Sequence, residues 1–580
     1  MSAALKNDPG INGIKINDSE YLLSQYADDS SLLLDDDETS LVNSLNILEK
    51  FSECAGLRAN LDKTEAIWIG SKVHSNDKLA LQRNLNWNYT GKFKLLGIKF
   101  DLFNEDKTIT NFEEKIEKIQ ALLNSWIYRE LTYMGKIIVI KSLALPILIQ
   151  SLTVLPNPPS SMLKQIQNIF FNFLWSGKPD KIKRNVLIGG YENGGLKMPH
   201  IESFCFSLKM TWINKLLDPL NISPWKTLLI DQYNKYGADK IWLMTPEGIN
   251  KVSSKFNSFW KDIFLNWNIL NNTPDITPEG IMKQSIWLNN NLKISNKTIF
   301  YQKWCDAGIY FICDLLDENS EFLTLENFCT RYNLDVNFLE YHSVIHMIPN
   351  TWKELIANSE KITQVTNENY EYVKKNKKSC QYFCQKFVNR HAVRPSKQEE
   401  KWDRDLNTNI ENWEMLYTMP FKCTKNNKLL MFQFKILHRT LATNAVLHRY
   451  GLKETHMCDF CNETKETICH LFWECMFVRN LWIEISEFVL QRCNFTILLD
   501  KKDLILGETT NESLYLFTVL VKYYIYTCRF NASVPCLAGA LKTLKNSYKI
   551  EKLSTSSYGT LRAREKFERK WNPFRNILDQ

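Results

Sequence analysis

The chain has 580 residues, 44% apolar and 12% aromatic, which is sufficient for several folded domains and excludes an intrinsically disordered protein. Its 72 Lys and Arg residues outnumber 64 Asp and Glu residues, and the net charge of +8 is compatible with nucleic-acid partners without demonstrating them. The odd number of cysteines, 15, and their scattered positions argue against the disulfide framework of a secreted protein.

The first predicted element is a β-hairpin with two adjacent aspartates at its tip. The apolar runs Tyr21–Tyr26 and Ser31–Leu34 predict two strands, so Asp28 and Asp29 fall in or beside the turn between them. Neighbouring carboxylates repel each other unless a cation neutralises them, and a pair of Mg²⁺ ions would do so. Such ions can hold the attacking and leaving oxygens of a phosphoryl transfer. The alternative is a solvated acidic turn, the better interpretation of an isolated Asp-Asp pair.

A helix and another strand are predicted after the hairpin. Apolar residues recur at helical spacing from about Glu38 to Cys54, and Gly56 is placed to end that helix. Residues 66–69 predict a further strand. The apolar stripe of the helix consists of Leu41, Leu45, Leu48 and Phe51.

Residues 101–175 carry an interrupted helical pattern. The most apolar part, residues 137–155, contains Lys141, Pro146 and Gln150, which predicts a pair of buried helices rather than a membrane span. The N-terminus lacks the basic-then-apolar pattern of a signal peptide. We therefore expect a protein of the cytoplasm, the nucleus or both, neither secreted nor bound to a membrane.

Residues 176–420 show no recognisable catalytic constellation, and we expect a helical connecting region there. Cys380, Cys384 and His391 lack a fourth ligand nearby, and we interpret this group as structural. Basic residues gather in three runs, each of which could contact phosphates or form a solvated helix face. The runs are Lys178, Lys181, Lys183 and Arg184; Lys374, Lys375, Lys377 and Lys378; and Arg562, Arg564, Lys566, Arg569 and Lys570.

The clearest ligand pattern in the chain is Cys-x2-Cys-x8-His-x4-Cys, formed by Cys458, Cys461, His470 and Cys475. Three thiolates and one imidazole can complete a tetrahedral zinc site, and the close first pair suits a small loop. The alternative is that these are buried apolar cysteines. Cys469 is a weaker candidate because its spacing to the other ligands is less suitable. The pattern predicts a structural zinc site.

A helix is predicted just before this zinc pattern. Leu430, Phe434 and Leu437 fall on one helical stripe, which favours a place in the core. Three polar residues of the same segment are better candidates for contact with nucleic acid: Lys435, His438 and Arg439.

Several motifs, in order along the chain, resemble the reverse transcriptases of non-LTR (LINE-type) retrotransposons. Tyr26-Ala27-Asp28-Asp29 resembles the catalytic box of the family's palm, and Gly13–Ile16 with Asn17 and Asp18 resembles the hairpin before it. Gly56–Thr64 and Leu95–Ile98 are similar to the next two palm motifs. Trp126, Arg129 and Leu131–Pro146 resemble the family's thumb, and Gly194–Pro199 resembles a family signature that follows the thumb. The Cys and His pattern resembles the family's carboxy-terminal zinc knuckle. Their order and spacing make a chance match improbable.

This resemblance implies roles for individual residues. Asp28 and Asp29 would hold Mg²⁺, Lys63 would lie near the incoming triphosphate, and Leu96, Gly97 and Ile98 would form the primer grip. The implied partners are an RNA template, which could be the element's own RNA, and a DNA primer. The family's further palm aspartate and fingers precede the hairpin, so we expect the chain to be a carboxy-terminal part with an incomplete two-metal site.

We therefore expect an α+β protein: a partial palm of a small antiparallel sheet and a helix, then a mostly helical thumb and carboxy-terminal region. The expected segments are palm 1–100, thumb 101–175, helical connection 176–420, zinc knuckle 421–490 and carboxy-terminal helices 491–580. Two hypotheses remain open. The chain is either a truncated RNA-directed DNA polymerase or a catalytically inactive, nucleic-acid-binding remnant.

Overall fold

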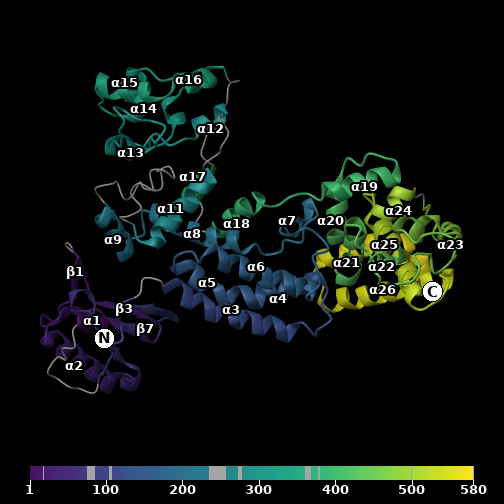
Figure 1. Ribbon diagram of the computed structural model, residues 1–580, viewed down its shortest axis with the longest axis horizontal. Coiled ribbons are helices and arrows are strands. Elements are labelled where there is room, and N and C mark those ends of the chain that lie inside the picture. Colours follow the sequence, from purple (N-terminus) through teal and green to yellow (C-terminus); the bar gives the residue numbers. More distant parts are fainter. Residues whose placement is uncertain are drawn as a thin grey trace. The chain divides into compact units, whose positions relative to one another are not determined.

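The computed structural model describes residues 1–16, 19–74, 85–103, 107–233, 256–271, 277–358, 368–375, 379–497 and 500–578. This part of the chain is mostly helical with small sheets (Figure 1), as expected for the predicted α+β class. Four of the residues discussed above, Asn17, Asp18, Lys377 and Lys378, lie outside it.

The chain divides into two compact units. The first comprises residues 1–118, 148–162 and 205–383, and the second comprises residues 119–147, 163–204 and 384–580. The chain passes from one to the other within helices: α3 (Lys107–Trp126), α5 (Leu145–Val154), α6 (Ser160–Trp175), α8 (Ile201–Leu217) and α18 (Cys380–Asn389).

The strands of the first unit form two-stranded ladders rather than the single antiparallel sheet that we expected. The antiparallel pairs are β1 (Ile14–Ile16) with β2 (Ser19–Tyr21), β3 (Leu23–Tyr26) with β4 (Asp29–Leu32), and β7 (Lys92–Leu95) with β8 (Ile98–Asp101). A parallel pair joins β5 (Glu65–Ala66) and β6 (Asn86–Trp87).

Three strand predictions were wrong in extent. The strand predicted at Ser31–Leu34 is β4, which begins at Asp29 and ends at Leu32. The run Tyr21–Tyr26 is divided at Leu22, and its two parts pair with different partners, β1 and β4. The predicted strand at residues 66–69 is limited to β5. Hydrophobic alternation shows that a segment is extended, but pairing partners determine where a ladder begins and ends.

The predicted helix near the hairpin is confirmed as α2 (Glu38–Ala55), next to the short helix α1 (Ser2–Asn7). The Asp37 carboxylate accepts a hydrogen bond from the Thr39 N–H at 3.0 Å, which satisfies a free donor of the first turn. Gly56 ends the helix in the left-handed conformation with φ 69°, which costs glycine little because it has no Cβ.

Residues 133–154 form one helix instead of the predicted pair. α4 (Tyr133–Val139) continues through a π-helical turn, Ile140–Ala144, into α5. Proline lacks the N–H of a regular helix, and here Pro146 lies two residues after the end of the π turn, where the hydrogen-bond pattern shifts. Among described helices, only this one is long and apolar enough to cross a membrane, a test that core helices also pass. Its buried Lys136 donates to the Phe173 carbonyl at 3.0 Å, a contact typical of a protein core.

The rest of the first unit is built from short helices around aromatic residues. The Trp287 indole N–H donates to the Ile309 carbonyl at 2.7 Å, and that of Trp304 donates to Glu340 at 2.8 Å. The helices are α9 (Pro224–Tyr233), α11 (Ser258–Asn271), α12 (Pro278–Met282), α13 (Gln302–Asp306), α14 (Leu325–Tyr332), α15 (Phe338–Met347), α16 (Asn350–Ala357) and α17 (Glu368–Lys375).

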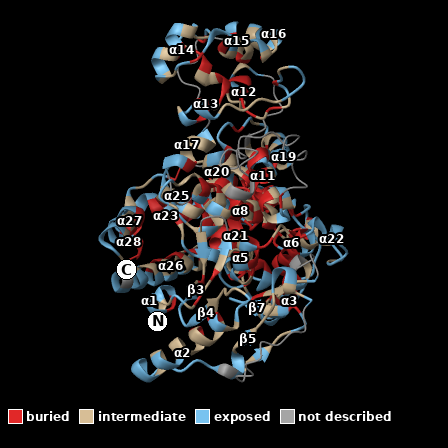
Figure 2. Cartoon of the chain, turned by 90° about the vertical axis from the view of Figure 1, so that its left-hand side faces the viewer, coloured by how far each residue is buried: buried red, intermediate tan, exposed pale blue. Residues whose placement is uncertain are grey.

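The carboxy-terminal part of the second unit has one continuous hydrophobic core from Trp402 to Leu578, with many buried residues on α21 and α25 (Figure 2). The expected boundaries at residues 421 and 490 both fall inside this core. The helices of the second unit that have not been given above are α7 (Arg184–Leu187), α19 (Ser396–Leu406), α20 (Trp413–Cys423), α21 (Asn427–Leu437), α22 (Asn444–Arg449), α23 (Met476–Cys493), α24 (Lys501–Leu506), α25 (Glu512–Phe530), α26 (Leu537–Tyr558), α27 (Leu561–Trp571) and α28 (Arg575–Leu578).

Candidate metal centre

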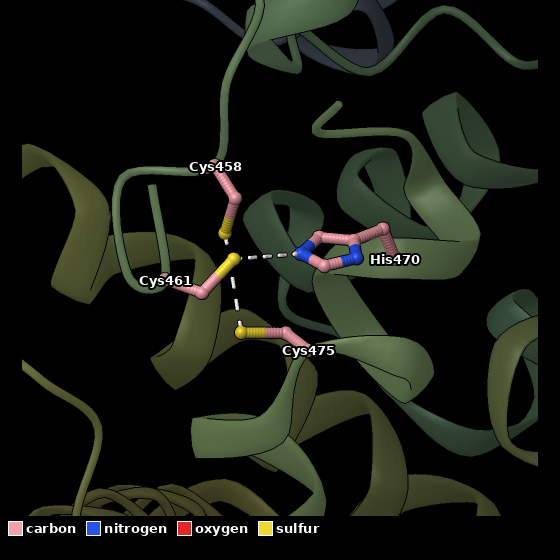
Figure 3. Close-up of side chains that lie close together, drawn as sticks. All are labelled: Cys458, Cys461, His470 and Cys475. Carbon is pink, nitrogen blue, oxygen red and sulfur yellow. Dashed lines mark hydrogen bonds between the residues drawn. The ribbon is translucent and has the colours of Figure 1, made fainter. Parts of the chain in front are cut away.

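The structure brings together all four residues of the predicted zinc pattern (Figure 3). The ligand atoms of Cys458, Cys461, His470 and Cys475 all lie within 4.8 Å of one another. The Cys458 and Cys475 sulfurs are 4.0 Å apart, and the Cys461 sulfur is 3.5 Å from His470 Nε2. In a tetrahedral zinc site, the corresponding separations are about 3.8 Å for two sulfurs and about 3.5 Å for sulfur and nitrogen. The donor set and its spacing therefore fit one zinc ion.

Two local structures position these ligands. Cys458 and Cys461 lie in a tight loop that is closed by hydrogen bonds from the Cys458 N–H to the Thr464 carbonyl and from the Asn462 N–H to the Cys458 carbonyl, both 2.9 Å. His470 begins a π-helical turn, His470–Glu474, and Cys475 follows it, directly before α23. A π turn changes the angular spacing of side chains, and such turns are frequent at functional sites.

The electrostatics of the cluster favour a bound cation. The hydrogen bond from the Cys458 thiol to Cys475, in which the two sulfurs share one proton, raises the pKa of Cys458 and lowers the pKa of Cys475. Burial lowers the pKa of His470, which keeps the imidazole neutral and able to donate its lone pair. A zinc ion would replace the shared proton and stabilise both thiolates.

A buried polar network supports the ligand loop. Glu466 lies between the two ligand pairs, and its Oε1 accepts from the Asn444 N–H at 2.7 Å. The Arg529 guanidinium, on α25, lies 2.9 Å from the same oxygen and donates to Asn444 Oδ1 at 2.7 Å. Asn444 in turn donates to the Met457 carbonyl, next to Cys458, at 2.7 Å. These contacts connect the loop to α22 and α25, and sequence spacing gave no sign of them.

Cys469, the alternative zinc ligand, lies outside the four-ligand group and inside the hydrophobic core. Burial raises the pKa of its thiol to about 11, so it remains protonated at neutral pH. Its environment is that of a buried apolar side chain.

The three candidate nucleic-acid contacts before the zinc pattern have different environments. Lys435 is half-buried, with its ammonium 5.3 Å from the Tyr133 ring centroid, and burial followed by the nearby Lys181 lowers its pKa. Arg439 stacks at 4.3 Å from the Trp402 ring centroid and pairs with Asp405.

His438 does not have the exposure that a nucleic-acid contact requires. It is only 3% exposed and its ring lies 4.2 Å from that of Phe434, so its assignment as a contact residue was wrong. The apolar stripe of Leu430, Phe434 and Leu437 is buried as predicted.

The aspartate hairpin has the predicted local geometry. Tyr26 of β3 pairs with Asp29 of β4, which leaves Ala27 and Asp28 in the connecting turn. Ala27 has φ 53°, a strained value for a residue with a Cβ, and such strain is frequent at functional sites. Lys63 is exposed at the end of a 3₁₀ turn, Leu61–Lys63.

The two aspartates offer oxygen ligands of the kind that Mg²⁺ prefers. Among the described residues, however, no group of three metal-ligating side chains includes Asp28 or Asp29. The hairpin therefore supplies two carboxylate ligands, and the described residues add no third ligand that would complete a metal site there.

The predicted primer-grip residues also form a tight hairpin turn. Leu96 and Gly97 have φ 46° and 82° and connect β7 to Ile98, the first residue of β8. The Gln150 side-chain amide donates to the Leu96 carbonyl. The turn is thus fixed to α5 within the first unit.

Residues 397–482 match the protein family described as zinc-binding in reverse transcriptase. All four ligands of the candidate zinc site lie inside this segment. The chain therefore contains a region related to reverse transcriptases, and that region has the geometry of a zinc site.

Proposed function

We propose that this chain belongs to a non-LTR retrotransposon reverse transcriptase, and that its core function is to bind an RNA template paired with a DNA primer. One observation carries the proposal. The four ligands that meet in space are those inside the segment related to reverse-transcriptase zinc-binding regions. Mg²⁺ and Zn²⁺ are the proposed metals, at Asp28 with Asp29 and at the Cys3His group.

Basic residues of the second unit support contact with phosphates. Lys435 is half-buried, lies near Lys181 and belongs to α21. Apolar residues of the same helix pack in the hydrophobic core that contains Cys458 and Cys475. A charge that is partly withdrawn from water interacts more strongly with a phosphate than a fully solvated one. Zinc would hold the ligand loop in place, and the loop would in turn stabilise α22 and α25 through Glu466 and Arg529.

We further propose that the 580-residue chain alone binds such a duplex but does not extend the primer efficiently. A two-metal polymerase site requires enough carboxylates to hold both ions, and Asp28 and Asp29 have no described third partner. When bound, Mg²⁺ would neutralise phosphoryl oxygens. The chain's own part would be to place the two carboxylates at the turn of the β3–β4 hairpin, where they would hold the ion.

The second candidate function is complete RNA-directed DNA synthesis by this chain. The strained φ of 53° at Ala27 favours it, because such strain costs stability and is frequent where a turn must direct side chains to a ligand. In that case Lys63 would act near the incoming triphosphate, and Leu96, Gly97 and Ile98 would support the primer end.

Binding and extension assays separate the two. Fluorescence anisotropy of a labelled RNA–DNA primer-template should show salt-dependent binding by the wild-type chain, weakened in Cys458→Ser and unchanged in the control Cys469→Ser. Absence of binding at low salt would contradict the proposed function. Binding with robust, Asp28-dependent extension would instead support the second candidate.

A further inference from the structure

A second group of metal-ligating side chains lies in the second unit, separate from the cysteine site. The ligand atoms of His200, Glu202 and His391 all lie within 4.8 Å of one another. His200 directly precedes α8, Glu202 lies in the first turn of that helix, and His391 follows α18. The sequence had grouped His391 with Cys380 and Cys384, whereas the chain fold places it beside residues almost 200 positions earlier.

His200 is oriented for binding through one particular ring nitrogen. Its Nδ1 lies 2.7 Å from the hydroxyl oxygen of Ser203, which is 1% exposed, so Nε2 is the nitrogen left for a ligand. A hydrogen bond to the other ring nitrogen is the usual way in which proteins orient a metal-binding histidine.

The backbone on both sides of the group is fixed by hydrogen bonds. The Gln167 side chain accepts from the Ile201 N–H at 2.9 Å and donates to the Pro199 carbonyl at 3.1 Å, so it holds the residues on either side of His200. On the other segment, the Val393 N–H donates to the Asn185 carbonyl at 3.1 Å. The imidazoles approach with ring centroids 4.8 Å apart. Fixed backbones reduce the entropy lost when side chains converge on an ion.

We propose that His200, Glu202 and His391 bind one zinc ion and leave a fourth position open for water or an exogenous ligand. Two imidazoles and one carboxylate form a common donor set of open zinc sites. Tetrahedral coordination would bring the donor atoms to about 3.3 Å from one another, and rotation of the exposed His391 side chain can close the remaining gap. The ion would join the start of α8 to the segment that leads into α19.

This site is independent of the proposed function, because its ligands are neither the aspartates nor the cysteine group. It differs in chemistry as well. The first site has three sulfur ligands and is mostly buried, whereas the second has none and includes an exposed residue. Cobalt distinguishes the two, since only a thiolate site gives an intense sulfur-to-cobalt charge-transfer band.

The test is a titration of the full-length, zinc-free chain with Co²⁺ and then Zn²⁺. We expect two equivalents to bind: one with the charge-transfer band, and one that gives only weaker ligand-field bands. His391→Ala and Glu202→Gln should each lower the affinity of the second equivalent at least tenfold and leave the first unchanged. The retained first equivalent shows that these variants are folded around the cysteine site.

His342→Ala is the matched control, because His342 and His346 form another histidine pair, on α15, outside any described group of three ligands. This variant should retain both equivalents. A single equivalent in the wild-type chain would overturn the proposal, as would a second equivalent that persists in His391→Ala or disappears in His342→Ala.

Discussion

Arg529 and Glu466 form an ion pair of 2.9 Å in which the two side chains are only 3% and 0% exposed. Arg529 comes from α25 and Glu466 from the loop between the two pairs of zinc ligands. Burial raises the pKa of Glu466, while Arg529 opposes that shift. The pair therefore joins a metal-binding loop to a helix of the carboxy-terminal core.

Replacement of Arg529 by Met should destabilise this core by about 3–5 kcal/mol, because it leaves Glu466 as a buried charge without its partner. Hydrogen exchange of amides between Trp402 and Leu578 would measure the loss. A second change, Glu466→Gln in the Arg529→Met background, should recover part of it by removing the unpaired charge.

Lys72→Met is the control for this prediction. Lys72 pairs with Asp36 at 2.7 Å, but the two side chains are 40% and 65% exposed, so water screens the interaction. This change should leave the protection of the core amides unaltered. Equal effects of Arg529→Met and Lys72→Met would contradict the importance of the buried pair.

Lys522 should make the stability of the core rise with pH in the alkaline range. Its ammonium is buried between Gln433 Oε1 and the Ile505 carbonyl at 2.9 and 2.8 Å, and burial lowers its pKa from 10.5 to about 7. Between pH 7 and 10.5 the unfolded chain therefore binds more protons than the folded chain, so the free energy of unfolding rises with pH. The contribution of Lys522 to this free energy is complete above pH 10.5 and is lost as the pH falls toward 7. Its size is at most about 5 kcal/mol.

Urea denaturation of the wild-type chain and Lys522→Met at several pH values would test this contribution. The Met variant should show a smaller increase in midpoint between pH 7 and 10. Ile505 retains a donor in this variant, because the Gln433 amide also contacts its carbonyl, at 3.2 Å. Parallel pH profiles would show that Lys522 is not the group responsible.

The local features of the chain could be predicted from its sequence. Gly56 as a helix end, the turn at Asp28 and the zinc spacing each depend on residues close together in the chain. For Cys458 to Cys475, the small loop itself limits how far apart the ligands can lie.

Features that depend on contacts between distant segments could not be predicted in this way. His391 meets His200, and Arg529 meets Glu466, only because helices from separate parts of the sequence pack together. His438 illustrates the same limit, because its polar character suggested the surface, while packing against Phe434 and Tyr417 buries it.

Lys435 and His438 should respond differently to substitution. Lys435→Met removes a half-buried charge next to Lys181 and should weaken RNA–DNA binding several-fold and reduce its salt dependence. His438→Phe should leave the affinity of the folded protein unchanged and alter only its stability, because the side chain is buried. Anisotropy titrations at several salt concentrations would decide, and unchanged binding by Lys435→Met would exclude it as a contact.

Asp28 should matter little to primer extension by the isolated chain, because extension itself should be weak or absent with Mg²⁺ or Mn²⁺. The physical reason is the lack of a described third ligand beside Asp28 and Asp29. Extension of a labelled primer on an RNA template by the wild-type chain and Asp28→Ala provides the measurement. Robust synthesis that disappears in Asp28→Ala would show that another part of the chain completes the site.

Zinc removal should loosen the carboxy-terminal core without affecting the aspartate hairpin. X-ray absorption of the chain loaded with one zinc equivalent should show three sulfurs near 2.3 Å and one nitrogen near 2.0–2.1 Å, roughly the usual zinc distances. After chelation, amide protection should fall first in residues 455–480, since a structural zinc contributes folding energy to its own module. We expect the loss to extend to α24 and α25, because the ligand turn and both helices belong to one hydrophobic core.

Single cysteine substitutions distinguish this site from a general effect of thiol loss. Cys458→Ser should abolish the sulfur-rich zinc signal and reproduce the effect of chelation, whereas Cys469→Ser and Cys380→Ser should retain it. Cys469 is the stricter control, because it adjoins His470 and is itself buried in the same core. If Cys469→Ser loses zinc as readily as Cys458→Ser, the four-ligand assignment is wrong. Protection of the β3–β4 amides should be the same in Cys458→Ser and Cys469→Ser, since both cysteines lie in the second unit and the hairpin belongs to the first.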